Sequence, residues 1–312
     1  MAARPSVPAH APALGSTHRL LGRFHVTGVF WYRLHYRAAK AWPNWVMYLA
    51  MLVFSAGFFV SLGRIRGAIA ANLEPVLGRA GLWTRSRRAY RTMRTFALCL
   101  TERYQRMAGR QSGRLTVEGE SFWGEATAGG RGAVLVTSHI GPWETAAYAG
   151  AAEERRVVHL VREAEIDPRA QAFIRELVAG DGRVVTHFAG EDPRLAIELA
   201  EALRRGELVA LQGDRPRTGG RTVMAQIFGQ PMPLPIGPAA LARAAGAPML
   251  PIFSFREGRR AGRIVVRPPI TVARTANREA DVAAAVHQLA REIEWAIRER
   301  PYQWFCFRRL WE

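Results

Sequence analysis

The chain has two parts that differ in the spacing of their hydrophobic residues. Residues 45–62, WVMYLAMLVFSAGFFVSL, form an uncharged apolar run. Residues 84–110 continue with apolar side chains at helical spacing among many arginines. From about residue 114 onward, short apolar runs alternate with helical stretches. This pattern predicts a helical region followed by an α/β unit.

Seven short apolar runs in the second part predict strands. They are RLTVEG, GAVLVTS, RRVVHLV, GRVVTHF, GELVALQ, PMLPIFSF and GRIVVRP. Pro168, Pro193 and Pro238 each follow a capping residue and predict helix starts, because proline is favoured at the first helical position. A last helix is expected over about 277–298. The predicted fold class is α/β, a central mostly parallel or mixed sheet of about seven strands flanked by helices, with an N-terminal membrane-associated helical region.

Three segments are expected along the chain. Residues 1–26 are rich in proline and alanine and lack the apolar core of a signal peptide, so they are expected to form a disordered tail. Residues 27–110 are expected to form the helical, membrane-associated region, and residues 111–312 the α/β domain. The boundary is placed in the break over 108–113.

The apolar run 45–62 only just reaches the minimum length of a membrane span, so it could cross a bilayer or lie shallowly in one. The stretch before it, FWYRLHYRAAKAW, alternates large aromatics with cations. This composition suits the interface, where rings sit among lipid head groups. Cations stand on both sides of the run, so they indicate no orientation. A buried core helix is the alternative.

The charge of the chain favours anionic partners. It carries 44 Lys and Arg residues against 26 Asp and Glu residues, a net charge of +18. Nucleic acid, anionic lipid, an acidic carrier protein and phosphorylated substrates all fit such a surface. Lys40 is the only lysine, so a GC-rich coding bias explains the arginine excess equally well. Cys99 and Cys306 have no metal or redox spacing, and neither a metal nor a cofactor is expected.

Three histidines stand five positions before an acidic residue, a spacing common enough to arise by chance. His287 and Glu292 fall within one predicted helix, where five residues turn about 500° and leave the side chains about 140° apart. His187 precedes Asp192, whose carboxylate is expected to cap the next helix. Neither of these pairs is expected to act in catalysis.

The third pair, His139 and Glu144, fits a catalytic use. The run GAVLVTS places His139 at the carboxyl end of a strand, the edge where open α/β sheets bind ligands. Gly141 and Pro142 then turn the chain into a helix with Glu144 in its first turn. A carboxylate that accepts the proton of one ring nitrogen leaves the other nitrogen free to take a proton from a substrate. A capping glutamate beside a structural histidine is the alternative.

Covalent catalysis by Ser138 is not expected. Adjacent strand residues point to opposite faces, so a hydrogen bond from Ser138 to His139 would need a distorted backbone. The chain also lacks the Gly-x-Ser-x-Gly elbow of serine hydrolases. His139 is therefore predicted to activate a substrate hydroxyl directly.

The motif SHIGPWE resembles the first acyltransferase block of bacterial lipid A lauroyl/myristoyl acyltransferases, part of the lysophospholipid acyltransferase superfamily. Two further stretches, RRGELVALQGDRPRTGG and IFGQPMPLPIGPAALARAAGAPMLPIFSFREG, are similar to the third and fourth blocks of that family in order and spacing. The resemblance also covers IAANLEPVLG and the aromatic, basic segment PYQWFCFRRLW.

The resemblance implies transfer of a fatty acyl group from acyl carrier protein or acyl-CoA to a hydroxyl of a lipid or glycolipid. It places the reaction at an anionic membrane surface, the cytoplasmic face of the bacterial inner membrane. His139 would be the general base, and Glu144 its partner. The absence of a Phe-Pro-Glu-Gly block argues against simple lysophosphatidate acylation, and Phe307 stands where a histidine is common. The acceptor therefore stays open.

Four further residues are candidates for substrate binding. Arg162 matches the second-block arginine and could hold a phosphate or the thioester oxyanion, with an ordinary surface arginine as the alternative. Asp214 matches the third-block acid. It either acts directly at the substrate, in binding or catalysis, or forms with Arg215 a structural pair that shapes the site. Gly237 could present backbone N–H groups to an anion, or form a plain tight turn.

Two other functions compete with acyl transfer. An acyl thioesterase would use the same site, with His139 activating water in place of an alcohol. A basic membrane scaffold would keep the apolar run and need no catalytic pair. A nucleic-acid-binding protein is disfavoured, because the chain carries no recognisable nucleic-acid-binding motif and such a protein has no use for the uncharged run.

Overall fold

The structure is a computed structural model of the chain. The residues it describes are 28–110, 113–146, 156–165, 167–178, 183–217 and 219–311. The expected N-terminal tail, residues 1–26, lies outside them.

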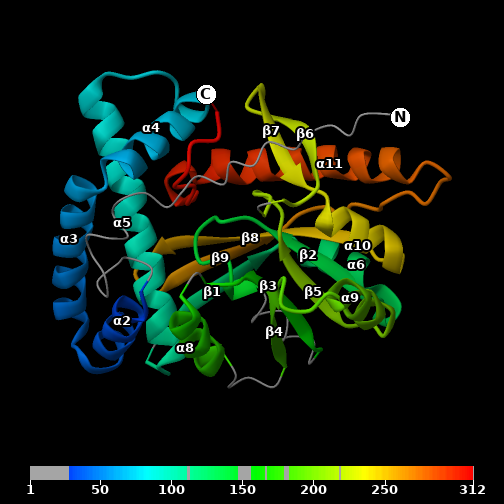
Figure 1. Ribbon diagram of the computed structural model, residues 1–312, viewed down its shortest axis with the longest axis horizontal. Coiled ribbons are helices and arrows are strands. Elements are labelled where there is room, and N and C mark those ends of the chain that lie inside the picture. The colour runs from blue at the N-terminus through cyan, green and yellow to red at the C-terminus, as the bar shows by residue number, and fades with distance from the viewer. Residues whose placement is uncertain are drawn as a thin grey trace, which may run out of the picture.

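A seven-stranded mixed sheet forms the centre of the fold (Figure 1). Its strand order is β1-β9-β8-β2-β5-β3-β4, and β8 and β9 are its one antiparallel pair. The predicted α/β fold class is confirmed, and each predicted strand corresponds to one strand of the sheet. The strands are β1 (Arg114–Glu118), β2 (Ala133–Thr137), β3 (Val158–Glu163), β4 (Val184–Ala189), β5 (Leu208–Gln212), β8 (Met249–Gly258) and β9 (Ala261–Val266).

Both faces of the sheet are covered at β2, which explains why this strand reads as a continuous apolar run. All five residues of β2 are buried, as expected for a parallel strand between two helical layers. Val134 and Val136 pack in one core with α9, α10 and α11, while Ala133 and Leu135 pack in another with α6. The carboxyl end of β2 is therefore held rigidly. The bounds are α6 (Glu120–Thr127), followed by the short η2 (Ala128–Gly130), α9 (Leu195–Arg204), α10 (Gly237–Ala245) and α11 (Arg278–Glu299).

Helix starts follow the sequence signals with one exception. α8 (Pro168–Val178) and α10 begin at or next to the expected prolines, and α11 begins after Asn277, whose side chain accepts a hydrogen bond from the backbone N–H of Ala280. α9 begins two residues after Pro193. There Asp192 accepts a hydrogen bond from the backbone N–H of Arg194, so its carboxylate stabilises the turn before the helix.

A two-stranded hairpin occupies a segment in which no strand was predicted. β6 (Thr222–Ile227) pairs antiparallel with β7 (Gln230–Pro235), and Phe228 and Gly229 connect them with positive φ angles. Prolines take every second position of β7, QPMPLP. The residues between them keep their N–H groups, so the strand can still pair along one edge. The sequence did not predict this strand because its proline content argues against β structure.

Four helices form a layer beside the sheet (Figure 1). They are α2 (Val29–Ala41), α3 (Asn44–Ser61), α4 (Gly63–Leu77) and α5 (Leu82–Met107), and α5 packs against the other three.

α3 contains nearly all of the uncharged run. Among the described residues it is the one helix long and apolar enough to cross a membrane, by length and composition, and only 17% of it is buried. Trp45, Val53 and Val60 are 70%, 64% and 74% exposed. The structure therefore does not support the alternative of a buried core helix.

Candidate functional site

His139 lies directly beyond the carboxyl end of β2, and its partner is an aspartate from the neighbouring strand. Nδ1 of His139 lies 2.7 Å from Oδ1 of Asp214. Asp214 follows β5, which runs parallel to β2, so the two strand ends bring the side chains together. A carboxylate only accepts hydrogen bonds, so Nδ1 carries the proton and Nε2 keeps its lone pair free. Nε2 is the nitrogen that can act as a base.

Glu144 has partners other than the one predicted for it. Its Oε2 lies 2.6 Å from Nε of Arg103, and its Oε1 lies 2.7 Å from Nη1 of Arg162. Among the described residues, no hydrogen bond joins Glu144 to His139. The predicted histidine and glutamate therefore stand in one loop but in different polar groups, and the carboxylate that contacts the imidazole is Asp214.

The electrostatics of the pair favour a neutral imidazole beside an ionised carboxylate. Burial alone would raise the pKa of Asp214, but His139 and Arg215 more than offset this and hold that pKa well below its usual value. Burial lowers the pKa of His139 below 6.5, partly opposed by Asp214. Arg215 lies close to both, with Nε 3.2 Å from Nδ1 of His139 and 3.7 Å from Oδ2 of Asp214. At neutral pH the site is therefore poised to accept a proton.

The pH dependence of turnover should report this shift. The predicted base, His139, can accept a proton only when neutral, and burial lowers its pKa below 6.5. For that role we expect kcat/KM to be level at pH 7 and to fall only below about pH 6.5. A pH–rate profile of the wild-type protein measures the midpoint of this acid limb. A midpoint above pH 7 would contradict a neutral, buried imidazole.

Glu144 ties together the loop after His139, α5 and β3. Arg162 is 8% exposed and its guanidinium also lies 5.9 Å from the centre of the Trp143 ring. Burial would raise the pKa of Glu144, but Arg103 and Arg162 hold it below its usual value. The arrangement is a buried carboxylate between two cations, and it fixes the side of the loop that faces α5.

Replacing Glu144 by glutamine should therefore lower the free energy of unfolding of the protein. The change leaves two arginines in a buried site without their counter-charge, which costs about 3–5 kcal/mol in comparable buried pairs. Denaturant unfolding measures the loss. The matched control is Glu191→Gln, whose ion pair with Arg175 is exposed and should cost at most about 1 kcal/mol. Equal stability of the two variants would show that the Glu144 cluster is not structural.

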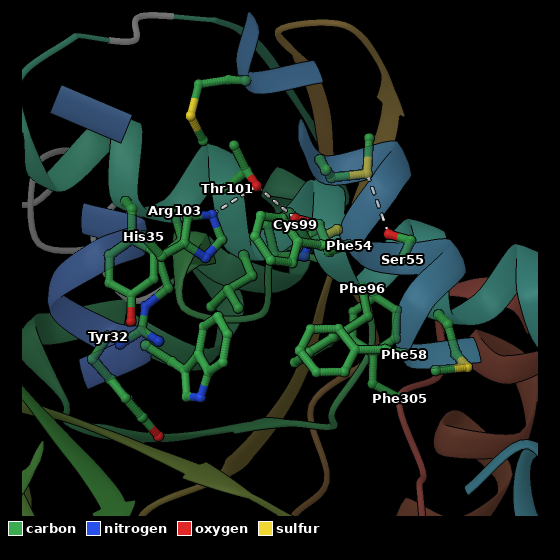
Figure 2. A pocket seen from close by; sticks show the side chains of 18 of the residues that line it. Tyr32, His35, Phe54, Ser55, Phe58, Phe96, Cys99, Thr101, Arg103 and Phe305 are labelled. Atoms are coloured by element: carbon green, nitrogen blue, oxygen red, sulfur yellow. Dashed lines mark hydrogen bonds between the residues drawn. The ribbon is translucent and has the colours of Figure 1, made fainter. Parts of the chain in front are cut away.

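A cavity of about 560 Å³ lies between α2, α3, α5 and the loop after His139. Figure 2 shows the rings of Phe58, Phe96 and Phe305 gathered on one side of it, with the more polar Tyr32 and His35 on the other. Residues 141–144 of the loop also line it, and the imidazole of His139 lies 6.1 Å from the ring of Trp143, centre to centre. His139 therefore stands at the rim of a mostly apolar cavity.

His35, on the polar side of the cavity, is uncharged at neutral pH. Its Nε2 lies 2.9 Å from Oγ1 of Thr101, and burial lowers the pKa of His35 to about 4. Tyr32 donates a hydrogen bond to Glu165, 2.8 Å long. These two polar side chains are therefore paired with neighbouring groups of the protein.

The remaining predicted residues, Arg215, Arg162 and Gly237, lie in three different places. Arg215 joins the His139–Asp214 pair, and Arg162 joins Glu144. Gly237 is the first residue of α10, which follows the β6–β7 hairpin in the chain. Their roles in substrate binding stay predictions. Sequence reasoning missed Arg103, which lies on α5 among many arginines that nothing in the sequence distinguishes.

The two other histidine–acid pairs do not form. Glu292 pairs with Arg267 at 2.6 Å, and His287 is exposed on α11. His187 stacks on His159, with ring nitrogens 2.9 Å apart. In the part of the chain that the structure describes, no group of three or more His, Cys, Asp or Glu side chains could hold a metal ion.

Comparisons with known proteins match nearly the whole chain to one family. The family described as "Bacterial lipid A biosynthesis acyltransferase" matches residues 30–312. The chain is 31% identical over 188 residues to the phosphatidylinositol mannoside acyltransferase of Mycobacterium tuberculosis, covering 60% of this chain and 56% of that protein. It is 26% identical over 211 residues to the Mycolicibacterium smegmatis protein of the same name, covering 66% of each. The chain thus spans less than two thirds of these relatives' length.

A solved structure is also similar in part. It is the 1-acyl-sn-glycerophosphate (LPA) acyltransferase PlsC of Thermotoga maritima, with 15% sequence identity and a TM-score of 0.36 over 82% of this chain and 98% of that chain.

Proposed function

The chain belongs to the bacterial lipid A biosynthesis acyltransferase family, and we propose that it transfers a fatty acyl group from an acyl thioester to a hydroxyl of a lipid or glycolipid. The observation that carries the proposal is the His139–Asp214 pair at the rim of the apolar cavity. The relatives' name favours a mannosylated phosphatidylinositol, a glycolipid, as the acceptor class. Acyl carrier protein and acyl-CoA both supply the required thioester.

In this reaction His139 works as a general base and then as a general acid. Nε2 takes the proton of the acceptor hydroxyl while its oxygen attacks the thioester carbonyl. Asp214 stabilises the imidazolium that forms and holds the ring in one tautomer. The tetrahedral intermediate then collapses, the C–S bond breaks, and the imidazolium returns the proton to the departing thiolate. The products are an ester and a free thiol.

The cavity offers a place for the acyl chain during this reaction. Its volume of about 560 Å³ lies within the usual range of small-ligand pockets, about 300–1,000 Å³. An alkyl chain buried among the phenylalanines gains the free energy of leaving water. Because residues 141–144 line the cavity, a chain inside it would place its carbonyl end toward His139.

Separate measurement of two products tests the proposal. Purified protein would be incubated with acyl-CoA or acyl carrier thioesters and a panel of membrane lipids, including mannosylated phosphatidylinositol. Acylated lipid and free fatty acid are then followed separately, with and without acceptor. The proposal expects acylated lipid that forms only with acceptor. Fatty acid released at the same rate without acceptor would establish a thioesterase instead. If neither product forms, the alternative of a non-catalytic membrane scaffold is favoured.

The exposed apolar face of α3 supports binding to a membrane. Its aromatic and aliphatic side chains lie uncovered beside cationic segments, and the chain carries a net charge of +18. Apolar insertion and attraction to anionic lipid reinforce each other, and together they give stable binding where either alone is marginal. We place the protein at the cytoplasmic face of the bacterial inner membrane.

Replacing Val53 by glutamate should weaken this binding about tenfold or more. Val53 is 64% exposed on α3, and inserting one such side chain is worth about 1.5 kcal/mol. Partitioning onto vesicles containing anionic lipid measures the effect. Ile197→Glu is the matched control, because Ile197 is 62% exposed on α9 and lies outside the helical layer. Equal losses in the two variants, or none in either, would rule out α3 as the membrane-binding face.

A further inference from the structure

Two segments that contribute no residue to the His139–Asp214 pair contact each other beside it. One is IAANLEPVLG on α4, which contains Asn72, and the other is residues 303–310 near the end of the chain, here termed the C-terminal strap. Asn72 is 2% exposed. Its Nδ2 donates to the carbonyls of Cys306 and Arg308, at 3.3 and 2.8 Å, and its Oδ1 accepts from the backbone N–H of Leu310 at 3.1 Å. One side chain thus satisfies three backbone groups of the strap.

The strap pairs directly with the loop that carries His139. The backbone N–H of Phe305 donates to the carbonyl of His139 at 2.8 Å, and the N–H of Gly141 donates to the carbonyl of Gln303 at 2.9 Å. Ile140 and Trp304 form an antiparallel bridge between these two bonds. The backbone position of the base is therefore set by the strap.

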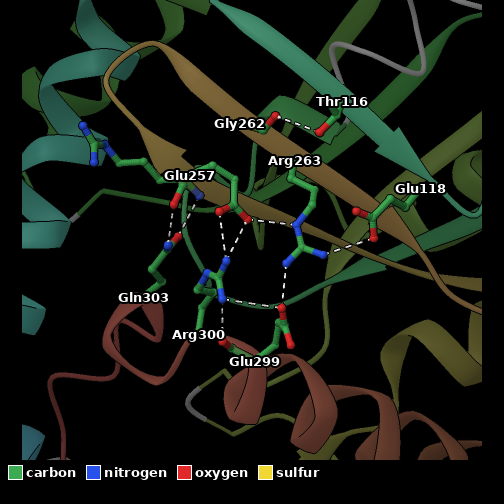
Figure 3. A network of polar contacts seen from close by, with 9 residues as sticks. Thr116, Glu118, Glu257, Gly262, Arg263, Glu299, Arg300 and Gln303 are labelled. Carbon is green, nitrogen blue, oxygen red and sulfur yellow. Dashed lines mark hydrogen bonds and ion pairs between the residues drawn. The ribbon is translucent and has the colours of Figure 1, made fainter.

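The strap is anchored at its other end to the sheet. The side chain of Gln303 accepts from the backbone N–H of Arg256 at 2.8 Å and donates to its carbonyl at 2.7 Å (Figure 3). Next to this anchor, Arg300 pairs with Glu257 at 2.9 Å. Gln303 therefore fixes the start of the strap on β8, while Asn72 fixes its end on α4.

Between the two anchors the strap forms one wall of the cavity. Phe305 and Phe307 both line it, and their rings lie 5.2 and 4.9 Å from that of Phe96, centre to centre. A strap that leaves α4 would move these rings and the His139 carbonyl together, because both belong to the same short segment.

We propose that Asn72 is a positioning residue of this site and a determinant of the acyl chain length it accepts. By holding the strap, Asn72 fixes the backbone under His139 and the wall made by Phe305 and Phe307. This inference rests on the proposed acyl transfer. Asn72 does not contact the substrate in this proposal. It acts only through its hydrogen bonds to the strap.

Two variants of the full chain test the inference. Asn72→Ala removes all three hydrogen bonds, while Asn72→Asp keeps the size and the acceptor but removes both donors. Both should lower kcat by about 10- to 100-fold, because small displacements of a reacting group are that costly. Both should also flatten the dependence of rate on acyl chain length. Arg309→Ala is the control, because Arg309 is exposed on the same strap and should change neither quantity.

Hydrogen exchange provides a readout separate from activity. Amide exchange at Phe305 and Gly141 should rise in both Asn72 variants while exchange in β2 and β5 stays as in the wild type. Unchanged exchange at these amides would overturn the inference, and so would raised exchange with unchanged kcat and chain-length profile.

Binding of a fluorescent fatty acid, cis-parinaric acid, separates this inference from the proposed function. If the wild-type protein acylates no lipid, acyl transfer fails as the function. Altered binding of the probe in the Asn72 variants, with Arg309→Ala unchanged, would still support the shaping of the cavity by Asn72. Identical probe binding in all variants would then refute it.

Discussion

Replacing His139 by alanine should lower the rate of acyl transfer by about 10² to 10⁴. In the proposed reaction the imidazole takes the proton of the acceptor hydroxyl and returns it to the departing thiolate, and alanine can do neither. Binding of the acyl chain should survive, because His139 lies at the rim of the cavity and is not part of its lining. Single-turnover formation of acylated lipid, compared with donor binding, separates these two effects.

His287→Gln is the matched control for this change. His287 is exposed on α11 and precedes Glu292 by the same spacing that separates His139 from Glu144. Its loss should leave the rate within about twofold of the wild type, as for a surface substitution. Wild-type turnover by the His139→Ala protein would overturn the assignment of the base, whichever product forms.

Replacing Asp214 by asparagine should be nearly as damaging, about 10² to 10⁴ in kcat. Asparagine keeps the shape of the side chain but loses the charge that stabilises the imidazolium. Its amide can also donate to Nδ1, which would move the ring proton to Nε2 and block the base. The pH dependence of kcat, measured beside that of the wild type, shows whether the defect lies in proton transfer.

A second buried aspartate provides the control for this prediction. Asp281 is 6% exposed and pairs with Arg243 on α10, in a separate ion pair. Asp281→Asn should lower stability but leave kcat per folded molecule unchanged. If Asp214→Asn behaves in the same way, the carboxylate has only a structural role and Glu144 would again be the candidate partner.

The strands were predictable because each is a short apolar run, and those at the centre of the sheet are largely buried. GAVLVTS and GELVALQ are apolar runs bounded by glycine or polar residues, which fits buried parallel strands. The β6–β7 hairpin was not predictable by the same rule, since prolines at every second position of QPMPLP argue against any strand. Only pairing along one edge of a two-stranded ribbon reconciles that composition with β structure.

The site was only partly predictable. His139 was found because it ends a buried strand before Gly141 and Pro142, a local pattern. Its carboxylate partner lies 75 residues away, and the two meet only because β5 lies next to β2, a neighbour relation that the sequence does not contain. Glu144 was expected to reach back to His139 from the first turn of a helix, but its carboxylate pairs with arginines on α5 and β3 instead.

A crystal structure with a non-hydrolysable acyl-CoA analogue, a thioether in place of the thioester, tests most directly whether His139 acts on a chain held in the cavity. We expect the alkyl chain to lie between α2, α3 and α5, against Phe96 and Phe305. The carbon that replaces the carbonyl carbon should lie close enough to Nε2 of His139 for an acceptor hydroxyl to contact both. A chain bound outside this cavity, or a reacting carbon remote from His139, would contradict both the site and the reaction proposed for it.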